Sequence, residues 1–214
     1  MRVLITGANR GVGAALLSTY AARGDEALGT ARGGGDLLPL EVTDPASHRA
    51  LVERLGDAPL DTLICNAGVY PDKGQPLDDG YPAEMWAQTF AVNVTGVFLT
   101  VQGMLPALRR AQAPKIAIIS SQMASSTRAP GGSYIYRASK AAALNLGRNL
   151  AVDLKRDGIA VGIYHPGWVR TDMGGGSADI STDEAASGLV ARIDALGPET
   201  TGCFETWDGR AHPY

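Results

Sequence analysis

The sequence predicts a single α/β domain with a parallel sheet, covering residues 1–214. Short apolar runs alternate along the chain with longer stretches whose apolar residues recur at helical spacing. A glycine-rich turn follows the first apolar run and leads directly into the first helical stretch, as in a βαβ unit. A chain of 214 residues fits one domain with a sizeable core.

Seven short apolar runs are typical of strands buried on both faces of a parallel sheet. They are residues 2–6, 26–31, 37–42, 60–65, 115–120, 159–164 and 202–207. The third run follows the second after only Gly33-Gly34-Gly35-Asp36, too few residues for the helix that a parallel crossover normally contains. We therefore expect an extended connection here, which leaves one face of the sheet thinly covered.

Five segments carry apolar residues at helical spacing. They are a stretch with Val12, Leu16, Leu17 and Tyr20 in its stripe, residues 45–56, residues 83–110, the stretch around Tyr136 and Lys140 to about Arg156, and residues 182–196. Asp44 and Pro45 give the second helix a cap and a suitable first residue. The third helix is apolar on more than one side, so one side is a candidate subunit interface, and Pro106 is expected to interrupt it.

Composition excludes several classes of partner. Hydrophobic residues make up 45% and charged residues 19% of the chain, and the net charge is −3, so nothing favours nucleic acid or an anionic membrane surface. No apolar run approaches about 20 residues, so we expect no membrane span, and no signal peptide is recognisable. Cys65 and Cys203 lie in apolar runs, which predicts reduced cysteines in a cytoplasmic protein.

The turn Gly7-Ala8-Asn9-Arg10-Gly11-Val12-Gly13 stands between a strand and a helix. Glycines let the backbone turn tightly and approach a pyrophosphate, and the helix start offers free N–H groups and a positive dipole. Asn66-Ala67-Gly68, after the fourth run, suits a similarly close approach to a ligand. The alternative for the first turn is a plain tight turn without a ligand.

The end of the second strand lacks the acidic residue that would hold a ribose 2′-hydroxyl. Arg32 stands there instead, and Arg10 lies in the glycine turn. Two guanidinium groups can bind one phosphate through forked hydrogen bonds, so NADP(H) is favoured over NAD(H). The alternative is that both arginines are solvated surface charges. Glu41 and Val42, after the third strand, are expected to frame the adenine.

Tyr136 and Lys140 lie four residues apart, one turn from each other on a helix face. An ammonium group near a phenol favours the phenolate and lowers the pKa of the tyrosine, which makes a proton donor and acceptor. Ser121 ends the fifth strand, where a hydroxyl can hold a substrate oxygen. Asn93, inside a helix, either faces solvent or serves a buried polar network.

In chain order these motifs resemble the short-chain dehydrogenase/reductase family over the full length. The matching parts are Thr6 to Gly13 for the cofactor loop, Asn66-Ala67-Gly68, the helix residue Asn93, the catalytic set Ser121, Tyr136 and Lys140, and Pro166-Gly167 with Val169 and Thr171 for the turn that holds the nicotinamide. Residues 137–139, 165–173 and 207–209 resemble the branch that contains the C-factor and small carbonyl reductases.

The resemblance implies a Rossmann-type, doubly wound, three-layer sheet of seven strands. It also implies that Tyr136 exchanges a proton with the carbonyl oxygen and that Ser121 holds that oxygen. Lys140 would bind the nicotinamide ribose, and Asn93 would support a water that connects Lys140 to solvent. Ser121 lies fifteen residues before Tyr136, two more than the family's commonest spacing. The alternatives for these roles are therefore kept open: Tyr134 for the tyrosine, and Ser125 or Ser126 for the serine.

We therefore expect an oxidoreductase that reduces an aldehyde or ketone with NADP(H), with NAD(H) as the alternative cofactor, and that reversibly oxidises the alcohol. The other function we consider is a non-enzymatic nucleotide-sensing or signalling protein on the same scaffold. Expected partners are a small carbonyl or alcohol substrate and further copies of the chain in a homodimer or homotetramer. We expect no nucleic acid, membrane or metal partner. Residues 70–81, 122–133 and 173–181 are expected to determine the substrate.

Overall fold

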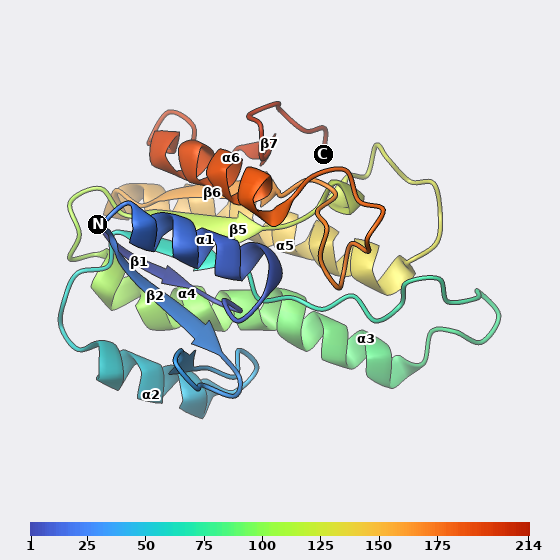
Figure 1. The fold of residues 1–214 in the computed structure, drawn as a ribbon, viewed down its shortest axis with the longest axis horizontal. Helices are drawn as coiled ribbons and strands as arrows, with labels where there is room; N and C mark the ends of the chain where they lie inside the picture. Colours follow the sequence, from blue (N-terminus) through green and yellow to red (C-terminus); the bar gives the residue numbers. More distant parts are fainter.

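The computed structural model describes residues 1–214 and contains one parallel sheet of seven strands (Figure 1). The strand order is β3-β2-β1-β4-β5-β6-β7, so the chain winds outward from the centre in both directions and reverses between β1 and β4. The strands are β1 (Arg2–Ile5), β2 (Glu26–Ala31), β3 (Leu38–Pro39), β4 (Thr62–Cys65), β5 (Lys115–Ile119), β6 (Ala160–His165) and β7 (Phe204–Thr206). The predicted doubly wound, three-layer fold is confirmed.

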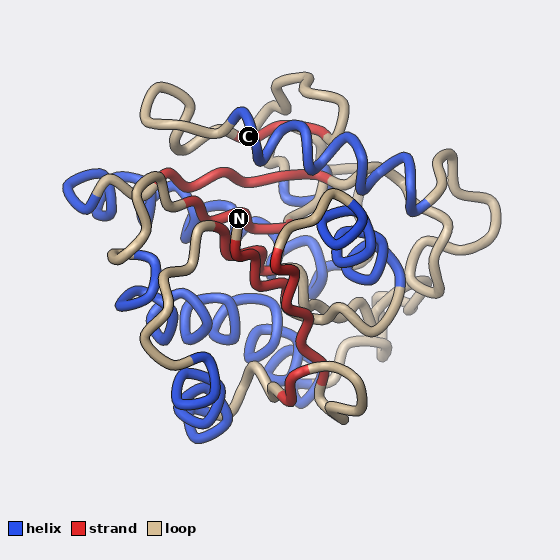
Figure 2. Tube along the Cα trace, turned by 60° about the vertical axis from the view of Figure 1, so that its left-hand side comes forward, coloured by secondary structure: helices blue, strands red, loops and turns tan.

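Helices cover both faces of the twisted sheet (Figure 2). One layer contains α1 (Gly11–Ala22) and α6 (Thr182–Ala195), and the other contains α2 (Pro45–Leu55), α4 (Gly96–Leu108) and α5 (Tyr134–Asp153), with α3 (Ala83–Phe90) leading into α4. Alternate strand residues face the two layers because successive side chains of a strand point to opposite faces. Val3 and Ile5 therefore pack with α1 and α6, whereas Leu4 packs with α2, α4 and α5.

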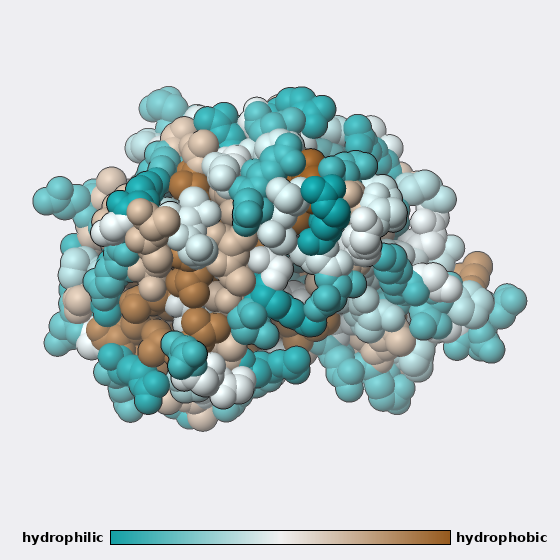
Figure 3. All heavy atoms as spheres, in the orientation of Figure 1, coloured by the Kyte–Doolittle hydropathy of each residue, from teal (hydrophilic) through white to brown (hydrophobic).

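The third strand is shorter than predicted, with two residues in place of 37–42. Pro39 cannot donate to the ladder, and the Glu41 carboxylate accepts hydrogen bonds from the N–H and hydroxyl groups of Thr43, which turns the chain. The expected absence of a helix between β2 and β3 is confirmed. Figure 3 shows apolar atoms at the surface below α1, where this helix is missing, and Leu17 and Leu37 are only partly buried.

The predicted long helix is interrupted at Asn93 rather than at Pro106. A π-helical turn, Ala91–Thr95, joins α3 to α4, whereas Pro106 lies inside α4, close to its end, without breaking it. The stretch Ala83–Leu108 is long and apolar enough on average to cross a membrane, although no unbroken apolar run of that length is present. Met104 and Leu108 of this stretch are fully buried in the core, as in the central helix of a packed domain.

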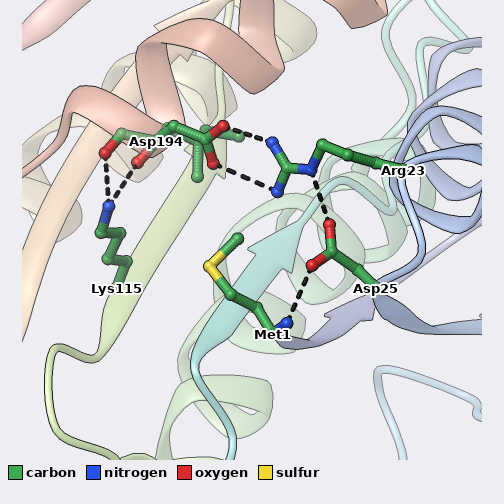
Figure 4. Close-up of polar contacts among 6 residues, drawn as sticks. Met1, Arg23, Asp25, Lys115 and Asp194 are labelled. Carbon is green, nitrogen blue, oxygen red and sulfur yellow. Dashed lines mark hydrogen bonds and ion pairs between the residues drawn. The ribbon is translucent and has the colours of Figure 1, made fainter.

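A series of polar contacts connects the elements at the end of the sheet opposite the glycine turn (Figure 4). Arg23, after α1, bonds to Asp25 and to Asp194 of α6, and the Met1 amino group bonds to the same Asp25 at 2.8 Å. Lys115 Nζ donates to the carbonyl oxygens at the end of α6, at 2.6 Å for Asp194, which caps that helix. Exposed ion pairs contribute under about 1 kcal/mol each, so the network connects elements more than it stabilises them.

Gly147→Ala is expected to destabilise the fold because α5 packs closely on the sheet at that residue. A Cβ at this position would lie 2.6 Å from Ile163 Cγ1 and 3.1 Å from Ile118 Cδ1, so overpacking should outweigh the gain in helix propensity and cost about 1–3 kcal/mol. The matched control is Gly103→Ala in α4, where the nearest side-chain atom is 3.8 Å away and a gain of about 0.5–1 kcal/mol is expected. Urea unfolding of both variants measures the difference, and a stabilised Gly147→Ala protein would contradict it.

Candidate active site

Thr6 and Asn66 join the ends of β1 and β4, where the winding of the sheet reverses. The Thr6 hydroxyl oxygen accepts hydrogen bonds from the backbone N–H groups of Asn66 and Ala67, both at 3.0 Å. The Asn66 side-chain amide donates to the carbonyl oxygens of Thr6 and Gly7 at the same distance. The two predicted turns are thus held against each other at the crevice where open α/β sheets bind ligands.

The glycine turn leaves room for a ligand backbone because its glycines carry no side chain. Gly7 and Gly11 have φ values of +65° and +56°, which other residues rarely adopt. A Cβ at Gly7 would lie 2.9 Å from Ala67 Cα, and one at Gly13 would lie 2.3 Å from Gly7 O. The first turn of α1 has no side-chain cap, so its N–H groups are free for an anion. These features fit a dinucleotide pyrophosphate.

The two arginines expected near a 2′-phosphate are both exposed, as is Asn9. The Arg10 guanidinium donates to the Asp172 carboxylate at 2.8 Å, in an ion pair of which the side chains are 69% and 80% exposed. Arg32 follows β2 directly and makes no hydrogen bond or ion pair with any other residue. Arg32 is therefore the less encumbered of the two for a ligand phosphate. Asp172 had not been expected to bind Arg10.

The Glu41 carboxylate is engaged within its own turn by Thr43, at 3.1 Å and 2.8 Å. Val42 is buried, and the backbone of Gly96 lies against it, since a Cβ at that glycine would be 2.9 Å from Val42 Cγ2. Val42 therefore forms a fixed wall at the end of the sheet, next to the expected adenosine position, and Glu41 is half-buried.

Tyr136 lies in the first turn of α5 and is 6% exposed. Burial raises the pKa of its hydroxyl, whereas the Ser121 hydroxyl lowers it, and the nearby Tyr70 and Asp72 raise it further. The expectation that Lys140 would lower this pKa is wrong for the chain as it stands. The Lys140 Nζ atom lies 5.7 Å from the centre of the Tyr136 ring, and burial outweighs its influence.

Lys140 is 5% exposed, one helical turn beyond Tyr136. Its Nζ atom donates to the carbonyl oxygen of Ile119, at the end of β5, at 2.9 Å. Burial lowers the pKa of the amine to about 8, because a low-dielectric surrounding disfavours its charged form. Gly68 lies beside this group, since a Cβ there would be 3.4 Å from Nζ. The lysine is thus close to the change between its two protonation states near neutral pH.

Asn93 belongs to a buried polar network, which decides between the two alternatives left by the sequence. Its Oδ1 accepts a hydrogen bond from the Val69 N–H at 2.8 Å, and its Nδ2 donates to Val69 O at 2.9 Å and to Ser139 Oγ at 3.0 Å. The Ser139 hydroxyl in turn donates to Tyr136 O at 2.8 Å. The π-helical turn directs Asn93 inward, as such turns often do at functional sites.

The structure separates Ser121 and Tyr136 from the residues considered as alternatives. Ser126 is exposed, and the buried Ser125 hydroxyl has no hydrogen-bond partner. Tyr134 is 39% exposed and packs edge to face on Tyr81, with ring centres 5.2 Å apart. Of the three serines, Ser121 is the one whose hydroxyl lowers the pKa of the Tyr136 hydroxyl.

The turn after β6 lies against the glycine turn. A Cβ at Gly11 would be 3.2 Å from Thr171 Cγ2, and the Thr171 hydroxyl oxygen accepts a hydrogen bond from the Gly174 N–H at 3.0 Å. Gly167, after Pro166, has a φ of +91°, and Val169 is buried. The predicted cofactor residues Gly11 and Thr171 therefore lie side by side. No group of three or more His, Cys, Asp and Glu side chains is arranged to hold a metal ion.

Sequence reasoning missed Tyr70 and Asp72, which lie in a loop that we interpreted only as a substrate loop. Tyr70 stacks on Tyr136 with ring centres 4.0 Å apart, and Asp72 is fully buried against the start of α5. Their partners are more than 60 residues further along the chain, so no local spacing could have indicated these contacts.

The sequence model of the short chain dehydrogenases matches residues 1–181. The chain is 37% identical to C-signal of Myxococcus xanthus over 78% of this chain and 99% of that protein. It is 33% identical to 1-hydroxy-2-glutathionyl-2-methyl-3-butene dehydrogenase of Rhodococcus sp. (strain AD45), over 97% of this chain and 96% of that one. Among solved structures, NADPH-bound carbonyl reductase from chicken fatty liver is similar with a TM-score of 0.90 and 30% identity, covering 100% and 98% of the two chains.

Proposed function

The chain belongs to the short-chain dehydrogenase family, and we propose that it is an NADP(H)-dependent reductase of aldehydes or ketones that also oxidises the corresponding alcohols. The observation that carries the proposal is the burial of Tyr136 beside the buried Lys140 on one helix, with Lys140 Nζ 5.7 Å from the centre of the Tyr136 ring and Ser121 buried just after β5. These groups supply a proton donor and a holder for a carbonyl oxygen at one end of a dinucleotide crevice.

The residues proposed to hold the cofactor lie in five turns that follow strands of the sheet and in the first two turns of α5. They are Gly7, Asn9, Arg10, Gly11, Val12 and Gly13 for the pyrophosphate and phosphate, Arg32, Glu41 and Val42 for the adenosine end, Asn66, Ala67 and Gly68 for the centre, and Tyr136, Lys140, Pro166, Gly167, Val169 and Thr171 for the nicotinamide end. When bound, NADPH supplies a hydride, and the protein supplies placement and a proton.

Tyr136 donates the proton in the proposed reduction. Because burial raises the pKa of its hydroxyl, the tyrosine stays protonated at neutral pH, which is the form that donates. In this proposal the buried Ser121 hydroxyl holds the carbonyl oxygen, so that the Tyr136 proton and the oxygen meet. Charge that develops on this oxygen is stabilised by the same two hydroxyl groups.

Lys140 and Asn93 restore the proton to Tyr136 in this proposal. The pKa of the Lys140 amine is lowered to about 8, so the amine releases and takes up a proton readily near neutral pH. Asn93 Oδ1 and Lys140 Nζ both lie within 3.4 Å of the position that a Cβ would occupy on Gly68. A water beside Gly68 would therefore meet both groups and connect the amine to solvent.

A nucleotide-sensing or signalling role without turnover is the second candidate. It is favoured by the 37% identity to C-signal. The complete set of Ser121, Tyr136, Lys140 and Asn93 weighs against it, because a protein that only binds a nucleotide has no need for a buried proton donor beside a buried amine. Turnover of a carbonyl substrate is the measurement that distinguishes the two candidates.

Tyr136→Phe is expected to abolish carbonyl reduction, with a loss of at least about 100-fold in kcat, because general acid catalysis contributes roughly that much. Oxidation of NADPH with a panel of aldehydes and ketones, followed by absorbance, measures the loss. Tyr134→Phe is the matched control and should retain activity. Equal activity of the Tyr136→Phe and wild-type proteins would contradict the proposed mechanism, and cofactor binding without turnover of any carbonyl by the wild-type protein would favour the signalling role.

Arg32→Ala is expected to raise the KM for NADPH by about tenfold or more, because a charged hydrogen bond to phosphate contributes about 1.5–3 kcal/mol. The KM for NADH, which has no 2′-phosphate, should change little and serves as the internal control. Steady-state kinetics with both cofactors measure the ratio. An unchanged KM for NADPH would show that the 2′-phosphate does not bind at Arg32.

We also propose that the protein forms a homodimer or homotetramer in the cytoplasm, where its two free cysteines would stay reduced.

Phe98 on α4 is 42% exposed, whereas Val97 and Val101 of the same helix are buried in the core. Phe98→Glu is expected to lower the oligomeric state, because it places a charge at the interface. Light scattering measures the mass, and Leu77→Glu, at a loop residue that is 70% exposed, is the control. Unchanged mass for Phe98→Glu would exclude this face.

A further inference from the structure

Asp72 carries a carboxylate that is completely buried, with 0% exposure. No lysine, arginine or histidine lies within ion-pair distance of it, although buried charges are usually paired. Its oxygens accept hydrogen bonds only from the backbone N–H groups of Ile135, at 2.8 Å, and Tyr136, at 3.3 Å. The charge is therefore compensated by the start of α5 alone.

The start of α5 depends on Asp72 because the helix lacks a cap of its own. Ser133, at the N-cap position, has a φ of +50° and its side chain caps no helix N–H group. Ile135 and Tyr136 are the second and third residues of the helix, whose N–H groups a cap normally binds. Asp72 binds both from the loop after β4. A carboxylate here also matches the positive end of the helix dipole.

The neighbours of Asp72 hold it in place from both sides. Tyr70 stacks on the Tyr136 ring, and its hydroxyl lies 2.6 Å from Ser133 Oγ. Lys73 Nζ donates to the carbonyl oxygens of Met173 and Gly174, at 3.3 Å and 3.4 Å. Residues 70–73 thus connect the loop after β6 to the first turn of α5.

Four groups near the Tyr136 side chain could influence the charge of its hydroxyl. The Ser121 hydroxyl favours a phenolate, whereas Lys140 Nζ lies 5.7 Å from the ring centre and its influence is outweighed by burial. Tyr70 and Asp72 act in the opposite direction and raise the pKa of the Tyr136 hydroxyl. The Asp72 carboxyl group lies at a fully buried site, where charges interact strongly.

We propose that Asp72 is a positioning residue of the active site, which fixes the first turn of α5 and disfavours negative charge on the Tyr136 hydroxyl. The tyrosine then rests in its proton-donating form, and the site is biased toward reduction of a carbonyl. This inference rests on the proposed reductase function.

Asp72→Asn tests the inference because it keeps a cap oxygen and removes the charge. The pH midpoint of alcohol oxidation, which requires the deprotonated tyrosine, is expected to fall by about half a unit to one unit. The control is Asp44→Asn, which alters the cap of α2, where Asp44 accepts hydrogen bonds from Ala46 and Ser47 at 2.8 Å and 3.2 Å. This control should lower stability and leave the pH midpoint unchanged.

A second measurement needs no turnover and separates this inference from the proposed function. The Cζ resonance of Tyr136 in protein labelled with ¹³C-tyrosine, assigned by comparison with Tyr136→Phe, should begin to titrate at lower pH in Asp72→Asn than in wild type. A shifted resonance in a protein that turns over no carbonyl would support the inference and contradict the reductase function. If Asp72→Asn is active and neither its Tyr136 resonance nor its pH midpoint shifts, the inference is overturned and the proposed reductase function stands.

If Asp72→Asn does not fold, Asp72→Ser offers a smaller uncharged cap and the same two measurements. Failure of both variants to fold, while Asp44→Asn folds, would assign Asp72 to folding alone and would also overturn the inference.

Discussion

The burial of the Lys140 amine is the constraint on which the rest of the site depends. An amine removed from water needs fixed hydrogen-bond partners, and the carbonyl oxygen of Ile119 provides one at the end of β5. The helix that carries Tyr136 is thereby fixed to the sheet. A Cβ on Gly68 would lie 3.4 Å from Nζ and 3.3 Å from Asn93 Oδ1. The buried amine thus lies where a helix, two strand ends and a π-helical turn meet.

Sequence periodicity predicted the elements that are long or bounded by clear signals. The second strand has the predicted ends, and the helix after Asp44 begins at Pro45 as expected. The third strand was predicted too long: Pro39, visible in the run, cannot donate to the ladder, and the run does not reveal that Glu41 bonds to Thr43. In the site, Tyr136 and Lys140 could be predicted because they lie within one helical turn. Asp72 could not be predicted as a site residue, because the residue of α5 to which it bonds lies 63 residues further along the chain.

The absence of a crossover helix between β2 and β3 reduces apolar burial at this edge of the sheet and leaves Arg32 accessible. Leu37 packs against the α1 side of the core in place of a helix, and the surface beside β2 stays apolar and partly exposed. Burial of apolar area is the main stabilising contribution in a domain of this size, so this edge contributes less than the centre does. Arg32, at the end of β2, remains open to solvent as a result, which leaves its guanidinium accessible to a cofactor phosphate.

The π-helical turn at Ala91–Thr95 has a consequence for how the chain tolerates changes in length. Such a turn accommodates one residue more than an α-helical turn, and each residue advances a helix by about 100°. Deleting a residue there would allow a continuous α-helix but would remove the wide turn that directs Asn93 inward. The surface loop at 71–81 can absorb insertions at its exposed tip. The π-helical turn before Gly96 cannot absorb insertions, because the inward-pointing side chain of Asn93 fixes its register.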